Sequence, residues 1–313
     1  MDGAMCGMMN AMQWRRRREV CTRLEFESYL AACEDITRES FYATPDIEDL
    51  IRTSSSLEWT SPQASGFAEN DRVRALYFPT EAGPSAPTVL ILHALMSASD
   101  IGYRRVAKWF NLRGWNVVFP HLPFHYTRTP KKYFNGELAI TANLVRNAET
   151  LRQGVKELRQ VMNTLRREGC QEFGVLGTSY GGWTGALLSF VEPDFRFLSL
   201  IQPIVNVHHA IWMNPGAAEM RRQLRAQGIK EGGIERHSHL SSPLHGMPLS
   251  REAKIIITAG KYDTVSRMLD LRELTERWKG TRFLEAPQGH FGYRALEMTL
   301  QELEEILPKP RLN

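Results

Sequence analysis

The chain has 313 residues, and 42% of them are apolar, so it can bury a sizeable hydrophobic core. This composition excludes intrinsic disorder and collagen-like repetition. Lys and Arg outnumber Asp and Glu by 39 to 35, and a net charge of +4 spread over such a chain gives no reason to expect a nucleic-acid partner.

The cysteines and the apolar stretches indicate the compartment. The four cysteines are scattered, with no C-x-x-C spacing, which is typical of a reducing, cytoplasmic setting. The longest strongly apolar stretch, residues 88–95, is far shorter than the roughly 20 residues needed to cross a bilayer. We therefore expect a cytoplasmic protein with no integral membrane segment.

The N-terminus does not resemble a secretory signal. A signal places its positive charge before its apolar segment, whereas here the Met-rich residues 1–12 precede the four arginines at 15–18. The crowded methionines leave open whether translation starts at Met1 or downstream. We expect the arginines to form a solvated charged cluster, the alternative being contact with anionic lipid or RNA.

The first part of the chain differs in pattern from the rest. Apolar residues recur at intervals of three and four within residues 15–55, which favours helix, and residues 53–70 are rich in Ser, Thr, Pro and Gly, which is typical of a linker. We therefore expect a helical N-terminal extension and linker over residues 1–70, followed by a separate domain over residues 71–313.

From residue 71 onward, strand and helix patterns alternate. Short apolar runs predict strands at residues 73–78, 88–93, 115–120, 173–176, 197–205, 254–258 and 282–285. Helical spacing predicts helices at residues 102–112, 147–168, 181–190, 266–279 and 293–306. The alternation implies an α/β fold with a mostly parallel sheet and helices on both faces. It stops at residues 206–250, where we expect a small cap-like insertion over the end of the sheet.

The strongest local motif is the G-x-S-x-G sequence Gly177-Thr178-Ser179-Tyr180-Gly181, between a predicted strand and a predicted helix. A serine at such a sharp turn has strained backbone geometry, and the flanking glycines let the chain pass closely. Ser179 is therefore the candidate nucleophile, the alternative being an ordinary glycine-rich turn. The backbone N–H of Tyr180, at the start of the helix, is a candidate donor to an oxyanion.

A second oxyanion donor should come from the loop after the predicted strand at residues 88–93. This loop reads His93-Ala94-Leu95-Met96, and the N–H of Leu95 is the candidate.

Further residues are candidates for substrate contact. They are His93 and Met96 from the same loop, His125 after the strand at residues 115–120, and Trp212 from the insertion. The alternatives are a role in loop structure for His125 and simple packing for Trp212.

A serine hydroxyl needs a general base, which is itself oriented by an acid. Asp263 and His290 each follow a predicted strand, so both should lie with Ser179 at the carboxyl edge of the sheet. Other interpretations remain open at this point: Asp263 also suits a helix cap, and His290 also suits a structural histidine.

Two further histidine pairs, at residues 208–209 and at 237 and 239, have no carboxylate or cysteine partner at ligand spacing. We therefore expect no metal site.

Three motifs together resemble the α/β-hydrolase superfamily, in the order Ser, Asp, His: residues 177–182, Gly260-x-x-Asp263-x-Val265 and Gly289-His290. The resemblance extends from about residue 71 to the C-terminus. It implies an eight-stranded, mostly parallel sheet, a Ser179–His290–Asp263 triad, and hydrolysis through an acyl-enzyme without metal or organic cofactor. The chain departs from the family at two places. A loop whose sequence is often His-Gly in the family is His93-Ala94 here, and the N-terminal extension has no recognised counterpart.

We therefore expect a hydrolase that cleaves a carboxylic ester or thioester of a small-molecule acyl substrate. A serine peptidase would use the same chemistry, and a non-catalytic ligand-binding or scaffold protein could keep the same fold. The oligomeric state does not follow from the sequence.

Overall fold

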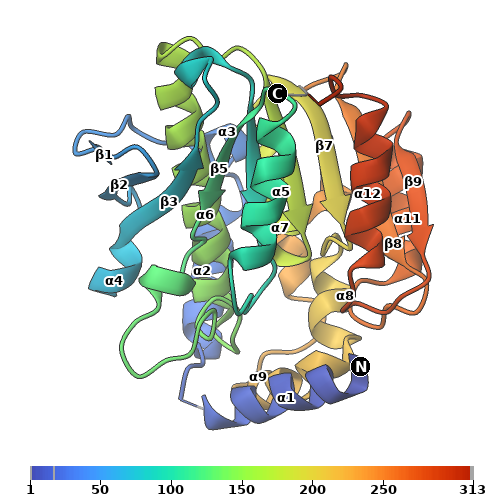
Figure 1. The fold of residues 1–313 in the computed structure, drawn as a ribbon. Helices are drawn as coiled ribbons and strands as arrows, with labels where there is room; N and C mark the ends of the chain where they lie inside the picture. Colours follow the sequence, from blue (N-terminus) through green and yellow to red (C-terminus); the bar gives the residue numbers. More distant parts are fainter. Residues whose placement is uncertain (1, 17, 311–313) are drawn as a thin grey trace.

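The computed structural model describes residues 2–16 and 18–310. A nine-stranded sheet runs through the molecule in the order β1-β2-β3-β5-β4-β6-β7-β8-β9 (Figure 1). The first three strands are antiparallel to their neighbours, and the strands from β5 to β9 are parallel. The strands are β1 (Ile51–Arg52), β2 (Ser56–Thr60), β3 (Arg72–Phe78), β4 (Thr88–Leu92), β5 (Asn116–Pro120), β6 (Phe173–Thr178), β7 (Phe195–Ile201), β8 (Lys254–Gly260) and β9 (Arg282–Ala286).

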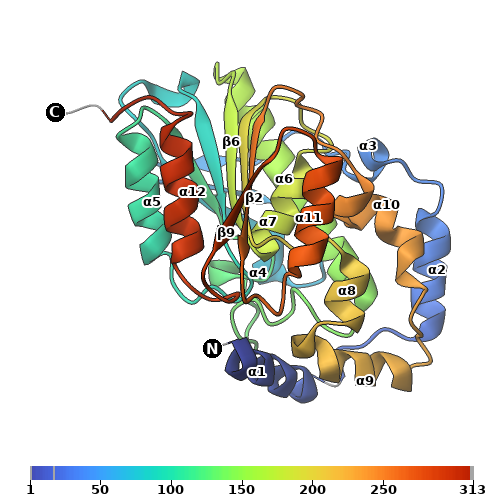
Figure 2. The same ribbon diagram turned by 90° about the vertical axis from the view of Figure 1, so that its right-hand side faces the viewer.

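Helices cover both faces of this sheet. Figure 2 shows α5 and α12 on one face and α6, α7 and α11 on the other. The helices are α1 (Asp2–Arg15), α2 (Arg23–Cys33), α3 (Arg38–Phe41), α4 (Ala68–Asp71), α5 (Ile101–Asn111), α6 (Leu144–Arg167), α7 (Tyr180–Leu188), α8 (Val207–Trp212), α9 (Ala218–Ala226), α10 (Ser238–Ser241), α11 (Met268–Arg277) and α12 (Arg294–Glu304). The predicted α/β class is confirmed.

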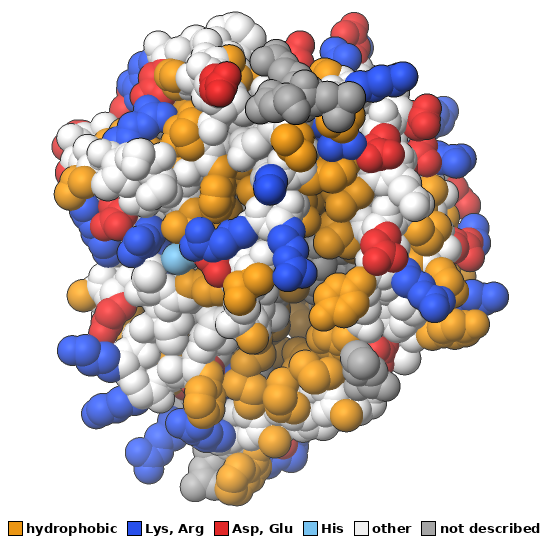
Figure 3. Space-filling view, viewed as in Figure 1, with side chains coloured by type: hydrophobic (Ala, Val, Ile, Leu, Met, Phe, Trp, Pro, Cys, Tyr) orange, Lys and Arg blue, Asp and Glu red, His pale blue; other side chains and the backbone are white. Residues whose placement is uncertain are grey.

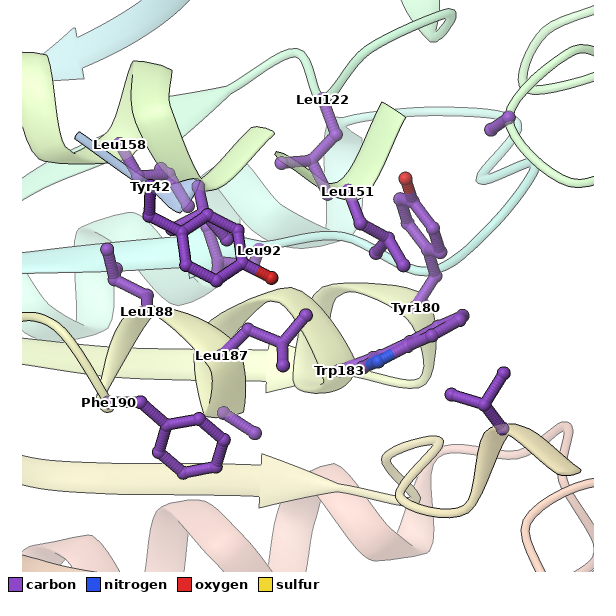
Figure 4. Close-up of a cluster of buried hydrophobic side chains, with 14 of the residues drawn as sticks. Tyr42, Leu92, Leu122, Leu151, Leu158, Tyr180, Trp183, Leu187, Leu188 and Phe190 are labelled. Carbon is purple, nitrogen blue, oxygen red and sulfur yellow. The ribbon is translucent and has the colours of Figure 1, made fainter. Parts of the chain in front are cut away.

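The alternation of side chains along the strands divides the core into two layers. In β4, Val89 and Ile91 belong to the cluster under α5 and α12, whereas Leu90 and Leu92 belong to the cluster under α6 and α7. Figure 4 shows Leu92 in the second layer, above the side chains of α7. A strand buried on both faces reads as a continuous apolar run, which is why β4 is recognisable in the sequence.

The sheet has one more strand than the eight expected, and it begins earlier. The Ser- and Thr-rich segment predicted as a linker contains β2, which pairs with β3 from Ser56↔Leu76 to Thr60↔Arg72. Leu57 and Trp59 of β2 are each 1% exposed, and the indole of Trp59 donates to Gln160 Oε1 at 2.8 Å. Turn-forming residues on both sides of β2 dominate the composition of this segment. For that reason the composition does not reveal a short strand in which alternate residues are buried. The additional strand is the two-residue β1.

The helices α2 and α3 pack on the α6 face of the sheet. The helix α2 begins with a capping box, in which Thr22 accepts from Glu25 N–H and the Glu25 carboxylate accepts from Thr22 N–H. Its Phe26 and Leu30 join the same apolar cluster as Phe41 of α3. The helical prediction for this part of the chain is therefore confirmed for α2 and α3.

Within the arginine cluster, Arg15 and Arg18 are exposed as expected, whereas Arg16 is not. Arg16 is 6% exposed, and its guanidinium pairs with the buried carboxylate of Glu137 at 3.0 Å, because the end of α1 packs against the loop that contains Glu137. Arg17 lies outside the described residues.

The segment between β7 and β8 is folded as short helices rather than irregular chain. It contains α8, α9 and α10 with the 3-10 turns Pro215–Ala217, Ile234–His237 and Pro243–His245. The helix α9 contacts α1 beyond the carboxyl edge of the sheet (Figure 1). None of the helices in the described part of the chain combines the length and hydropathy that a membrane span requires.

Candidate active site

Ser179 lies at the junction of β6 and α7 with φ 52° and ψ −110°. This left-handed geometry is strained for a residue with a side chain, at a cost of about 1–3 kcal/mol. A Cβ on Gly181 would lie 2.2 Å from Leu92 O, and one on Gly177 would lie 2.6 Å from Gly181 O. The turn therefore requires glycine on both sides of the serine.

The serine begins a series of side-chain hydrogen bonds. Ser179 Oγ lies 2.8 Å from His290 Nε2, and His290 Nδ1 lies 2.8 Å from Asp263 Oδ2. Because a carboxylate only accepts, the proton of the neutral imidazole belongs on Nδ1, and Nε2 is left to accept from the serine hydroxyl. The Asp263 side chain is fully buried and the His290 side chain is 7% exposed, so water hardly competes for these contacts.

The carboxylate of Asp263 is held by three N–H donors besides His290. The backbone N–H groups of Val265 and Ser266 donate to Oδ1 at 2.7 and 2.8 Å, and Gln202 Nε2 donates to Oδ2 at 2.6 Å. These charge-assisted bonds stabilise the negative charge of a carboxylate that water does not reach.

Gln202 is a site residue that sequence reasoning missed. It follows β7 with φ 47°, and its Nε2 also donates to Gly289 O at 2.8 Å. Its Oε1 accepts from Gln288 Nε2 at 2.8 Å. The side chain therefore ties the loop of Asp263 to the loop of His290. The only signal in the sequence is its place at the carboxyl end of a strand.

Asp2, at the start of α1, is a second missed residue. Its carboxylate accepts from the backbone N–H of His290 at 2.9 Å and from that of Thr264 at 3.3 Å. A Cβ on Gly289 would lie 2.4 Å from Asp2 Oδ1, so the close approach depends on that glycine. No local sequence pattern predicts a contact between residues that are 288 positions apart.

The two predicted oxyanion donors line the same cavity as Ser179. The neighbouring N–H groups are occupied, because Ala94 donates to Tyr103 Oη at 3.2 Å and Met96 donates to His125 Nε2 at 3.1 Å. Within residues 2–16 and 18–310, no hydrogen bond uses the N–H of Leu95 or of Tyr180. Both groups are therefore available to an oxygen that carries developing charge.

His93 and His125 do not reach the cavity, contrary to the expected substrate contact. Both are 0% exposed. His93 Nε2 accepts from Leu122 N–H at 3.1 Å, and Nδ1 of His125 donates to Pro123 O at 2.8 Å. Burial lowers the pKa of His125 to about 4 and that of His93 well below its usual value, so both are neutral at pH 7. They hold the loops around β4 and β5, and His125 fixes the N–H of Met96.

Of the other two predicted contacts, Met96 lines the cavity and Trp212 does not. Trp212 is 8% exposed and packs under the guanidinium of Arg225, 5.6 Å from its ring centroid. In the same helix, Ala210 is the residue that faces the cavity, because positions two apart on a helix point in different directions.

The cavity beside Ser179 has a volume of about 310 Å³ and mainly apolar walls. Figure 3 shows hydrophobic side chains gathered around a hollow in the lower half of this face, above α1. The walls also include residues of the loop 94–97, of α1 and of the segment after β7, together with Ile140, Thr178, Trp183 and Val265.

The adjacent histidines His208 and His209 each contact carboxylates. His208 contacts Glu231 and Glu235, and His209 Nδ1 lies 2.7 Å from Asp270. In the described part of the chain, no three His, Cys, Asp or Glu side chains gather in a way that could hold a metal ion.

No protein-family model matches this sequence, and no curated protein sequence matches it. Solved structures do resemble it. An acetyl xylan esterase from Paenibacillus sp. R4 has a TM-score of 0.63 at 12% identity, over 92% of this chain and 96% of that one. Acetyl xylan esterase 1 from Thermoanaerobacterium sp. JW/SL YS485 has a TM-score of 0.60 at 17% identity, over 92% and 95%. A thermophilic esterase from Thermogutta terrifontis has a TM-score of 0.52 at 16% identity, over 76% and 88%.

At these identities the likeness concerns the fold. The strand order, the parallel pairing from β5 to β9 and the serine turn after β6 agree with it. The chain has the fold of the α/β-hydrolase superfamily.

Proposed function

We propose that this protein hydrolyses carboxylic esters or thioesters through Ser179, His290 and Asp263. The observation that carries the proposal is the pair of 2.8 Å contacts from Ser179 Oγ to His290 Nε2 and from His290 Nδ1 to Asp263, beside an apolar cavity. The fold shared with known esterases is consistent with it.

In acylation, Ser179 Oγ attacks the carbonyl carbon while its proton passes to His290 Nε2. The carbonyl oxygen gains negative charge and accepts from the N–H groups of Tyr180 and Leu95. The tetrahedral intermediate then expels the alcohol or thiol, which takes the proton from His290. The acyl group remains on the serine, and Asp263 orients and stabilises the imidazolium throughout.

In deacylation, water takes the place of the departed alcohol. His290 removes a proton from the water as its oxygen attacks the acyl-enzyme, and the same two N–H groups stabilise the second oxyanion. The bond to Ser179 Oγ breaks, the serine regains its proton from His290, and the carboxylic acid leaves. His290 relays each transferred proton, and the water supplies the proton that Ser179 lost to the departed alcohol or thiol.

The first test is labelling with a fluorophosphonate, which reports an activated serine without requiring the right substrate. Wild type should be labelled at Ser179, and Ser179→Ala should abolish both labelling and hydrolysis of p-nitrophenyl esters, with a loss of at least about 10³-fold in kcat. The matched control is Ser189→Ala, because Ser189 ends the same helix and its hydroxyl only donates to Ala186 O at 2.7 Å.

A folded wild type that is neither labelled nor active on any ester would refute the proposal. Saturable ligand binding that persists in Ser179→Ala without turnover would then identify a binding protein. Faster cleavage of amide than of ester substrates would make the enzyme a peptidase instead.

A further inference from the structure

The helix α1 forms one wall of the cavity beside Ser179. Met5, Met8 and Met9, together with Gln13, line the cavity. Their spacing of three and four residues places them on one side of the helix. These methionines of α1 therefore lie where they could contact a substrate bound beside Ser179.

Polar contacts along its whole length hold α1 in place. At its start, Asp2 accepts from His290 N–H at 2.9 Å. In its middle, Asn10 donates to Pro215 O at 3.0 Å and accepts from Glu219 N–H at 2.9 Å. At its end, Gln13 Nε2 donates to Ile140 O at 2.9 Å. The helix thus joins the loop of His290 to the segment after β7, with Met5, Met8 and Met9 lining the cavity.

A second, smaller cavity lies next to the first. The two share Ile140, Trp183, Ala210 and Met220 as lining residues. The second has a volume of about 70 Å³ and an almost wholly apolar wall that reaches Phe26 of α2. Two adjacent and mainly apolar cavities therefore lie between Ser179 and the N-terminal helix α2.

We propose that these two cavities form the binding site for a linear, apolar acyl chain, and that the methionines of α1 contact the chain and set the preference for its length. The inference rests on the proposed function, since it names the acyl group that Ser179 would receive. The first cavity alone, at about 310 Å³, is many times larger than the roughly 10–15 Å³ that a single water molecule needs. An acetyl group would leave most of that space unfilled.

The physical basis is the burial of methylenes. Each one moved from water to an apolar wall favours binding about fourfold. Methionine suits such a wall, because its unbranched thioether adapts to chains of different shape. kcat/KM should therefore rise from acetyl to octanoyl p-nitrophenyl esters, by at least about tenfold in total.

The double variant Met5→Gln/Met9→Gln tests the role of α1. Glutamine has nearly the length and helix propensity of methionine, so the helix is kept while its wall becomes polar. The ratio of kcat/KM for octanoyl to acetyl ester should fall at least about fivefold. The matched control is Met12→Gln, since Met12 lies on the same helix and does not line the cavity; it should change the ratio less than about twofold.

A second variant, Ala210→Phe, tests the use of the second cavity without changing α1. A phenyl ring in the wall shared by the two cavities should lower the ratio of kcat/KM for octanoyl to acetyl ester, and an unchanged ratio would contradict the use of the second cavity.

Several outcomes separate this inference from the proposed function. If Ser179 is labelled and acetyl ester is hydrolysed, but kcat/KM does not rise with chain length, the acyl-binding site is refuted and the hydrolase remains. An unchanged octanoyl to acetyl ratio in Met5→Gln/Met9→Gln refutes the role of α1. Absence of both labelling and turnover refutes the proposed function itself.

Discussion

Gln202 gives the candidate site its rigidity. One amide nitrogen donates both to Asp263 Oδ2 at 2.6 Å and to Gly289 O at 2.8 Å, so it fixes the loops of Asp263 and His290 relative to each other. Its own backbone is held because Ser266 Oγ donates to Gln202 O at 2.7 Å. A catalytic histidine is effective only within a small range of orientations, and Gln202 acts on that orientation through Asp263.

Gln202→Ala should therefore impair the chemical step rather than substrate binding. Loss of the bond to the carboxylate, at about 1.5–3 kcal/mol, corresponds to roughly a ten- to hundredfold drop in kcat, with KM within about twofold because Gln202 does not line the cavity. Steady-state kinetics on a p-nitrophenyl ester would check this. Gln171→Ala serves as the control, since Gln171 is exposed and distant in the fold. A rise in KM at constant kcat would contradict the positioning role.

At the scale of elements, α6 connects the sheet to the loops around the site. Its Glu157 carboxylate accepts two bonds from the fully buried guanidinium of Arg128, at 2.7 and 2.8 Å. Arg128 also donates to Asn70 O and to His121 O. This ion pair joins α6 to the loop after β5 and to the segment before β3.

Arg128→Met should lower the free energy of unfolding by about 3–5 kcal/mol, because Glu157 is left buried without its partner. The double variant Arg128→Met/Glu157→Met should recover part of this loss. Urea unfolding followed by circular dichroism measures both. Arg72→Met is the contrast, since the Arg72–Asp49 pair is exposed and worth at most about 1 kcal/mol. If the single and double variants lose equal free energy of unfolding, the unpaired charge of Glu157 is not the cause of the loss.

At the scale of the whole molecule, several buried histidines tie stability to pH. Burial lowers the pKa values of His121, His125 and His237 to about 4. The unfolded chain binds protons at these residues below about pH 6.5, whereas the folded chain does so only near pH 4. Unfolding therefore takes up protons in this window, and the free energy of unfolding falls as the pH falls from about 6.5 to about 4.

Each such histidine should contribute about 3 kcal/mol to the loss over that window. His237→Phe tests one of them with little change of packing, because His237 lies between the rings of Tyr29 and Phe41 and its Nε2 has no partner in the described chain. Urea unfolding at pH 7 and pH 4.5 should show a smaller difference for the variant than for wild type. Equal differences would mean that His237 is protonated in the folded state.

Local patterns in the sequence are sufficient to predict the α/β class and the strained serine turn. Apolar runs and helical spacing are patterns within a few residues. A single segment of the sequence is therefore enough to predict a strand or a helix, as for β4 and α6. The turn at Ser179 is equally local, because it needs only its two flanking glycines and a strand and helix on either side. Local composition also gave a wrong prediction, because the turn residues around β2 favoured a linker where the structure has a strand.

The tertiary structure alone decided which polar side chains meet. His93 and His125 were expected at the substrate and are instead in the core, where His93 reaches a residue 29 positions away. Gln202 and Asp263 are 61 positions apart, and Asp2 and His290 are 288 apart. Such contacts depend on how helices and strands pack against one another, and no spacing within a single segment encodes that. The sequence assigned no role to the methionines of α1. In the structure, the packing of this helix places Met5, Met8 and Met9 in the wall of the cavity.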